Sequence, residues 1–108
     1  MRGLRQRIAA VAGSGPAYVY LLLERFADAA VGLGFAPDDA QRTVAQTFSG
    51  ALALLQATGE DPAALRRAVT SPGGTTAAAV AVFDERDLGG LIAAALEGAI
   101  RRAEALAR

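Results

Sequence analysis

Residues 70–76, TSPGGTT, interrupt a chain whose other long stretches are rich in alanine and leucine. Pro72 removes a backbone donor, fixes its own φ and favours an extended conformation at Ser71. Gly73 and Gly74 permit positive φ and allow another group to approach the backbone closely. The stretch therefore predicts a tight turn that ends one helix and leads into the next.

The predicted turn is suited to binding an anion. A turn that feeds a helix leaves the first N–H groups of that helix unpaired, close to the partial positive charge of the helix end. The hydroxyls of Ser71, Thr75 and Thr76 would add donors, so the turn could hold a carboxylate or a phosphate. An ordinary helix–helix loop capped by threonine explains the same residues and remains the alternative.

The regions on both sides of the turn predict an all-α domain of about five helices. Helical runs bounded by Gly and Pro are expected at about residues 16–33, 37–58, 63–69, 77–84 and 88–107. β-Branched and aromatic residues are sparse, which disfavours a sheet. Residues 1–11 are expected to be a basic N-terminal lead-in, and residues 12–108 a single helical domain.

The first of these helices carries more apolar surface than a domain of 108 residues can cover. Apolar and aromatic side chains surround nearly the whole of its N-terminal half: Tyr18, Val19, Tyr20, Leu21, Leu22, Leu23 and Phe26. A helix that is apolar on all sides must be buried on all sides. The surplus favours an interaction face for a partner chain over a monomer core.

Composition excludes several kinds of function. The 11 basic and 11 acidic residues balance, so no basic face for nucleic acid is indicated. The chain has no Cys and no His, which excludes thiol chemistry and removes the usual general base and the commonest metal ligand. The longest apolar run, residues 17–23, is far shorter than the roughly 18 residues of a membrane span. We expect a cytoplasmic protein without metal, nucleic acid or membrane.

Two motifs taken together resemble pyrroline-5-carboxylate reductase, and in particular its C-terminal, helical dimerisation domain. The motifs are GSGPAY at residues 13–18 and TSPGGTT at residues 70–76. The residues around the second motif also fit the family: Pro62, Leu65 and Val69 before it, and Ala79-Val80 and Phe83-Asp84 after it. The similarity covers about residues 12–106. Its Ser-Pro-Gly-Gly-x-Thr core is specific, whereas Gly-Ser-Gly-Pro alone would be weak.

The resemblance implies an oxidoreductase of proline biosynthesis, which reduces 1-pyrroline-5-carboxylate to L-proline. In that family an N-terminal Rossmann domain binds NADPH or NADH, and the helical domains of two subunits form an intertwined dimer that can assemble further. The turn would hold the substrate here. Ser71 and the backbone N–H groups around Gly73, Gly74 and Thr75 would bind the ring carboxylate, and Thr76 would hydrogen-bond the ring nitrogen as the catalytic residue.

Two features depart from the family pattern. Residues 66–68 are Arg-Arg-Ala, so the acid that the family commonly has at position 67 is absent. These 108 residues also lack a Gly-rich strand–helix fingerprint, so we expect no cofactor site in them and no turnover by this chain alone. The sequence therefore fits the dimerisation and substrate-binding part of the enzyme. The alternatives are a non-catalytic helical dimerisation module or gene remnant with the same fold, and a small anion-binding module.

Overall fold

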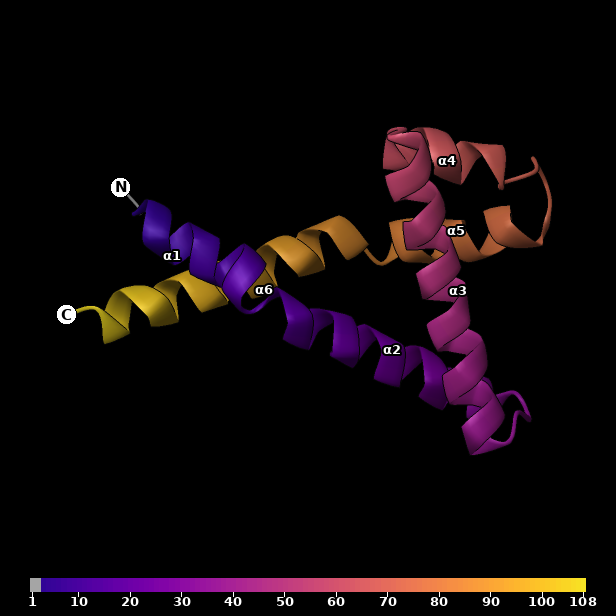
Figure 1. The fold of residues 1–108 in the computed structure, drawn as a ribbon, viewed down its shortest axis with the longest axis horizontal. Helices are drawn as coiled ribbons and strands as arrows, with labels where there is room; N and C mark the ends of the chain where they lie inside the picture. The colour runs from indigo at the N-terminus through magenta and orange to yellow at the C-terminus, as the bar shows by residue number, and fades with distance from the viewer. Residues whose placement is uncertain (1–2) are drawn as a thin grey trace.

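The computed structural model describes residues 3–108, in which every regular element is a helix (Figure 1). The α-helices are α1 (Leu4–Ile8), α2 (Gly15–Gly32), α3 (Pro37–Thr58), α4 (Pro62–Ala68), α5 (Thr75–Glu85) and α6 (Leu88–Leu106), and a π-helix, η1 (Ala9–Gly13), joins α1 to α2. The predicted all-α domain of about five helices is confirmed by α2 to α6. The expected lead-in is itself helical from Leu4 onward, in α1 and the first part of η1.

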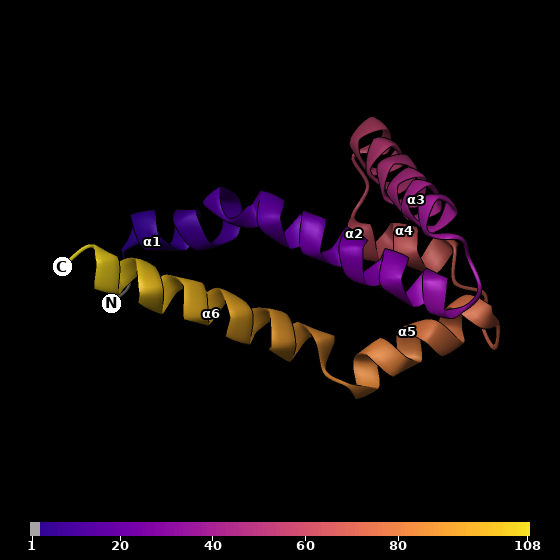
Figure 2. The same ribbon diagram turned by 90° about the horizontal axis from the view of Figure 1, so that it is seen from below.

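The helices form an open and elongated arrangement. α1 and η1 lie beside α6, so that both ends of the chain are found at the same end of the molecule (Figures 1 and 2). α2 runs away from this pair and packs against α3, while α4 and α5 follow at the far end. The radius of gyration is 16.6 Å, against about 13 Å for a compact domain of this length. A single chain therefore encloses little interior.

Helix ends follow the local sequence closely. α3 begins at Pro37, which suits the first helical position, and Asp38 and Asp39 stand in its first turn, where negative charge is favourable. It ends at Gly59, whose φ of 66° is the left-handed conformation that terminates many helices. The predicted bounds of α3, residues 37–58, are confirmed. Proline marks the start of this helix, and glycine marks its end.

Asp87 holds the start of α6. Its φ of 54° is unusual for a residue with a side chain. The Asp87 carboxylate accepts a hydrogen bond from the Gly90 backbone N–H at 3.1 Å, which satisfies one of the otherwise unpaired donors of the first turn. A Cβ atom at Gly90 would lie 2.0 Å from an oxygen of this carboxylate. Asp87 is therefore the N-cap of α6.

The single chain has almost no buried core. Among residues 3–108, the buried side chains are those of Ala10, Ala27 and Ala40. An aromatic cluster joins α2, α3 and α5, in which the Phe26 ring lies 5.3 Å from the Phe48 ring and 6.5 Å from the Phe83 ring, centroid to centroid. Yet Phe26 and Phe83 remain 41% and 43% exposed. This aromatic cluster is thus only partly covered.

Large apolar side chains are exposed along several helices. They include Val19, Tyr20, Leu21 and Leu22 on α2, Leu52 and Leu54 on α3, and Leu88, Leu91 and Ile92 on α6. Contiguous exposed apolar surface of this kind marks an interaction face in soluble proteins. Within residues 3–108, no helix is both long and apolar enough to cross a membrane.

A tyrosine hydroxyl ties α2 to the π-helix. Tyr18 donates a hydrogen bond to the Ala10 carbonyl at 2.6 Å. In an α-helix, Ala10 would accept from the N–H of Ser14, but that N–H donates instead to the Ala9 carbonyl at 2.8 Å. The hydroxyl of Tyr18 therefore supplies the buried Ala10 with the donor that the π-helical geometry takes away.

Replacing Tyr18 with phenylalanine is expected to lower the free energy of unfolding by about 1–2 kcal/mol, because the Ala10 carbonyl would be left without its donor. Chemical denaturation at fixed protein concentration measures the change. Tyr20→Phe is the matched control, since Tyr20 lies on the same helix and is 69% exposed. Equal stability losses in the two variants would contradict the assignment.

Candidate functional site at the turn between α4 and α5

The Ser71-Pro72-Gly73-Gly74 segment forms a β-turn. The Gly74 N–H donates to the Ser71 carbonyl at 3.0 Å, which closes the turn. Gly73 has a φ of 73°, as a type II turn requires at its third residue, and proline is favoured at the second. The turn predicted from the sequence is confirmed, and each of its residues suits its position.

The end of α4 is closed by its own hydrogen bonds. The Thr70 hydroxyl donates to the Arg66 carbonyl at 2.5 Å. The backbone N–H groups of Val69 and Thr70 donate to the carbonyls of Arg66 and Arg67, each at 3.2 Å. Both the hydroxyl and the N–H of Thr70 therefore stabilise the end of α4, directly before the turn begins.

α5 begins at Thr75, two residues before the predicted start at Ala77. Gly74 is the N-cap residue in an extended conformation, and no side chain caps the helix. A threonine cap on α5 is therefore wrong, whereas an ordinary helix–helix loop remains the alternative to a binding site. The Ala78 N–H donates to the Gly74 carbonyl at 3.1 Å, so the N–H groups of Thr75, Thr76 and Ala77 precede the first α-helical hydrogen bond and point out of the helix end.

The turn thus gathers the predicted site residues in one place. Ser71, Gly73, Thr75 and Thr76 are exposed, and Gly74 is partly buried. The turn lies at the outer edge of the single chain, far from α1 and the two termini (Figure 1). Its exposed hydroxyls and the uncapped N–H groups of α5 can donate hydrogen bonds to an anion. The other side of a binding pocket would be formed by residues outside the turn.

Other hollows of the surface lie away from these donors. One of about 400 Å³ lies between α3 and α4 and is lined by Ala51, Leu52, Leu54, Leu55, Pro62, Leu65, Arg66, Ala68 and Val69. It is almost wholly apolar and runs along α4, and none of residues 70–76 lines it. Residues 3–108 hold no group of three or more His, Cys, Asp or Glu side chains placed to bind a metal ion.

Replacing Gly73 with alanine is expected to destabilise the chain by about 1–2 kcal/mol, because a residue with a Cβ atom is strained at positive φ. Gly73→Asn is the control, since asparagine tolerates this conformation better. Thermal unfolding of the two variants measures the difference. A Gly73→Ala variant as stable as the wild type would show that the turn adopts another geometry.

Comparison with known proteins gives a consistent result. A family model described as "Pyrroline-5-carboxylate reductase dimerisation" matches residues 4–106. The chain is 41% identical over 105 residues to pyrroline-5-carboxylate reductase of Synechocystis, covering 97% of this chain and 39% of that protein. It is 42% identical over 100 residues to the Pseudomonas aeruginosa enzyme of the same name, covering 93% of this chain and 37% of that protein.

Solved structures agree with this match. The Plasmodium falciparum pyrroline carboxylate reductase with NADP bound superposes with a TM-score of 0.91 at 28% identity, covering 96% of this chain and 40% of that one. The Coxiella burnetii pyrroline-5-carboxylate reductase gives 0.88 at 40% identity, covering 94% and 37%. This chain therefore spans about two fifths of the length of the proteins that it matches.

Proposed function

Because the chain belongs to the pyrroline-5-carboxylate reductase family, as a match to its dimerisation domain, we propose that it is the dimerisation and substrate-binding part of an NAD(P)H-dependent reductase of proline biosynthesis. The reaction would convert 1-pyrroline-5-carboxylate to L-proline. The observation that supports this best is the type II turn at Ser71–Gly74, which leads directly into the uncapped N-terminus of α5. The substrate and product are small, soluble and charged, so we also propose a cytoplasmic location.

The turn would hold the carboxylate of the cyclic imine. The N–H groups at the start of α5 and the Ser71 hydroxyl are donors that suit a carboxylate, and the helix end favours negative charge. The Thr76 hydroxyl would donate a hydrogen bond to the ring nitrogen. This contact would orient the ring and polarise the C=N bond, so that the carbon becomes more electrophilic.

A nicotinamide cofactor would supply the hydride in this reaction, but the described residues do not fit such a cofactor. Residues 3–108 contain no strand, and a dinucleotide fingerprint needs a strand that runs into a glycine-rich turn. NADPH or NADH would be bound by another part of the enzyme. The role of this chain is to bind the imine and hold its ring in place.

We further propose that two copies interlock as an intertwined homodimer. The support is the scarcity of buried side chains in the single chain, together with the exposed apolar residues of α2, α3 and α6. A partner would cover these surfaces, and it could also supply the missing wall beside the turn. Assembly beyond the dimer would use surface that remains free afterwards.

A chimera tests the proposed function. The segment of the Pseudomonas aeruginosa enzyme that matches this chain is replaced by residues 4–106. We expect the chimera to oxidise NADPH or NADH only when 1-pyrroline-5-carboxylate is present, and the isolated chain to be inactive. A folded and dimeric chimera without turnover would contradict the proposal and favour a non-catalytic dimerisation module.

Binding to the isolated chain separates the remaining alternative. Amide signals of residues 73–76 are followed by NMR while L-proline or inorganic phosphate is added. The proposed function predicts a response to L-proline. A response to phosphate alone would favour a general anion-binding module.

A further inference from the structure

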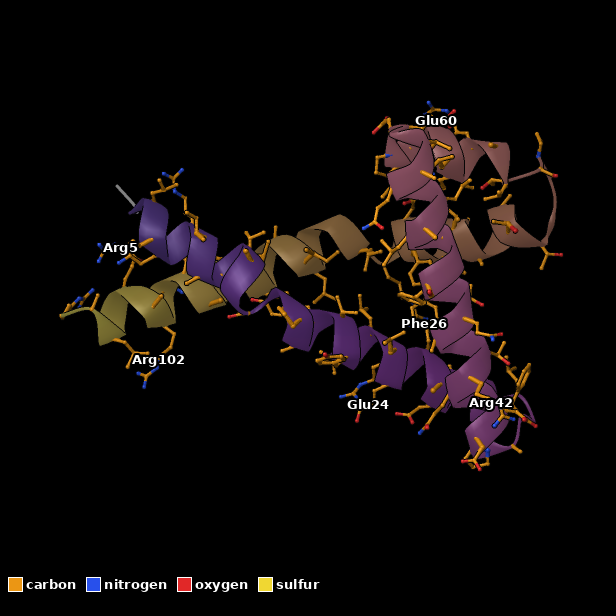
Figure 3. All side chains as sticks on the ribbon, viewed as in Figure 1. Arg5, Glu24, Phe26, Arg42, Glu60 and Arg102 are labelled. Atoms are coloured by element: carbon orange, nitrogen blue, oxygen red, sulfur yellow. The ribbon has the colours of Figure 1, made fainter. Side chains whose placement is uncertain are left out.

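An aromatic residue near the C-terminal end of α5 joins this helix to α2. The Phe83 ring lies 6.5 Å from the Phe26 ring, centroid to centroid. Phe26 in turn packs edge-on against Phe48 of α3, with ring centroids 5.3 Å apart and ring planes at 70°. Phe26 lies where α2 approaches α3 (Figure 3). The Phe83 ring therefore connects α5, which begins at the predicted site, to the packed pair of α2 and α3.

Thr76 and Phe83 lie on the same face of α5. Both positions are inside the helix, which runs over Thr75–Glu85. At about 100° per residue, seven residues make almost two full turns, so the two side chains differ by only about 20° around the axis. Thr75 is turned by about 100° from Thr76. Val80, which lies between Thr76 and Phe83 on this face, is partly buried. The Thr76 hydroxyl thus belongs to the side of α5 that packs toward α2.

α5 has little other support on this side. Among the described residues, the closest backbone packing of α5 is against α6, the next helix in the chain. At its other end α5 follows the turn at residues 71–74, which is largely exposed. The hollow between α3 and α4 is lined by no residue of α5. The contact between Phe83 and Phe26 is therefore a main constraint on the direction of α5, and so on the position of its first turn.

We propose that Phe83 is a positioning residue, which fixes the direction of α5 through Phe26 and so places the Thr76 hydroxyl at the ring nitrogen of the bound imine. This inference rests on the proposed function of the turn. Phe83 acts without touching the substrate, because seven residues of helix rise by about 10 Å, which is longer than a five-membered ring. A misplacement of about 1 Å in an active site can cost about 10²-fold in rate, so a tilt of α5 is enough to affect the reaction.

A double-mutant cycle in the chimera tests this role. Phe83→Ala is expected to lower kcat about tenfold, because Thr76 is no longer held in place. In the Phe83→Ala background, Thr76→Val should reduce kcat/KM by a factor about ten times smaller than it does alone, since both changes remove the same contact. A role of Phe83 in stability alone would leave the effect of Thr76→Val unchanged, and that result would overturn the assignment.

Three further variants serve as controls, each assayed at a concentration at which light scattering shows it to be dimeric. Phe35→Ala is the matched change, since Phe35 is 44% exposed and takes part in neither ring contact, and it should leave kcat unchanged. Phe83→Leu keeps a large apolar side chain and should retain most of the activity. Phe83→Val is a milder truncation, for which the same coupling to Thr76→Val is expected if Phe83→Ala is unfolded. Equal losses of kcat in Phe35→Ala and Phe83→Ala would contradict the proposal.

A measurement of helix orientation does not depend on the reaction. Residual dipolar couplings of the backbone amides in the isolated chain give the direction of α5 relative to α3. We expect this direction to change in Phe83→Ala and to stay the same in Phe35→Ala. An unchanged direction in Phe83→Ala would overturn the inference, whatever the activity. A direction that depends on Phe83, in combination with a chimera that is inactive before any substitution, would count against the proposed reaction alone.

Discussion

Replacing Thr76 with valine is expected to lower kcat/KM of the chimeric enzyme for 1-pyrroline-5-carboxylate by about 10²-fold, as for the loss of one well-placed donor in an active site. Valine keeps the shape of threonine and removes the hydroxyl that would bond the ring nitrogen. Steady-state rates of NADPH oxidation measure the effect, which should fall mainly on kcat.

Two controls separate this effect from damage to the helix. Thr76→Ser keeps the hydroxyl and should retain most of the activity. Thr75→Val removes the neighbouring hydroxyl, and the effect should be small because Thr75 is proposed to act through its backbone N–H. Since Gly74 is the N-cap residue, none of these changes removes a helix cap. An equal loss in Thr75→Val and Thr76→Val would contradict the role of Thr76.

Replacing Leu91 with aspartate is expected to raise the dissociation constant of the proposed dimer by at least about 10²-fold, because a carboxylate would have to be buried without a partner. Leu91 lies on α6 and is 67% exposed in the single chain, which marks it as surface that the partner would cover. Light scattering over a range of protein concentrations measures the fraction of dimer.

Arg102→Asp is the control for this experiment. Arg102 lies on the same helix, and its side chain points away from the neighbouring helices (Figure 3). The charge change there should leave the dimer intact. A Leu91→Asp variant that remains dimeric at low micromolar concentration, or a wild-type chain that is monomeric, would contradict the proposed interface.

Much of the helical order could be predicted from the sequence because proline and glycine mark the helix ends. Pro37 and Gly59 bound α3 as expected, and the proline–glycine turn lies where the sequence indicates. The sequence predicts the start of α5 two residues too late, because threonine has a modest helix propensity and the pattern favours a start at the first alanine. In the structure the extended Gly74 sets the boundary instead, and both threonines join the first helical turn.

The N-terminal region could be predicted less well. Residues 1–11 read as a basic lead-in, yet the chain from Leu4 onward is helical and packs beside α6. That packing joins segments from opposite ends of the sequence, so local pattern does not reveal it. The bond from Tyr18 to Ala10 depends on a π-helix, which propensity does not predict. The surplus of apolar surface, by contrast, follows from the apolar residues all around the predicted first helix and is confirmed by the exposed side chains of α2.

The start of α6 has a consequence for any redesign of this domain. The Asp87 carboxylate, which caps the helix, fills the volume that a side chain at position 90 would need. The two positions must therefore be changed as a pair. A helix-favouring alanine at position 90 would displace the cap, and it could stabilise α6 only in a variant that also replaces Asp87, for example with glycine, which tolerates the left-handed conformation there.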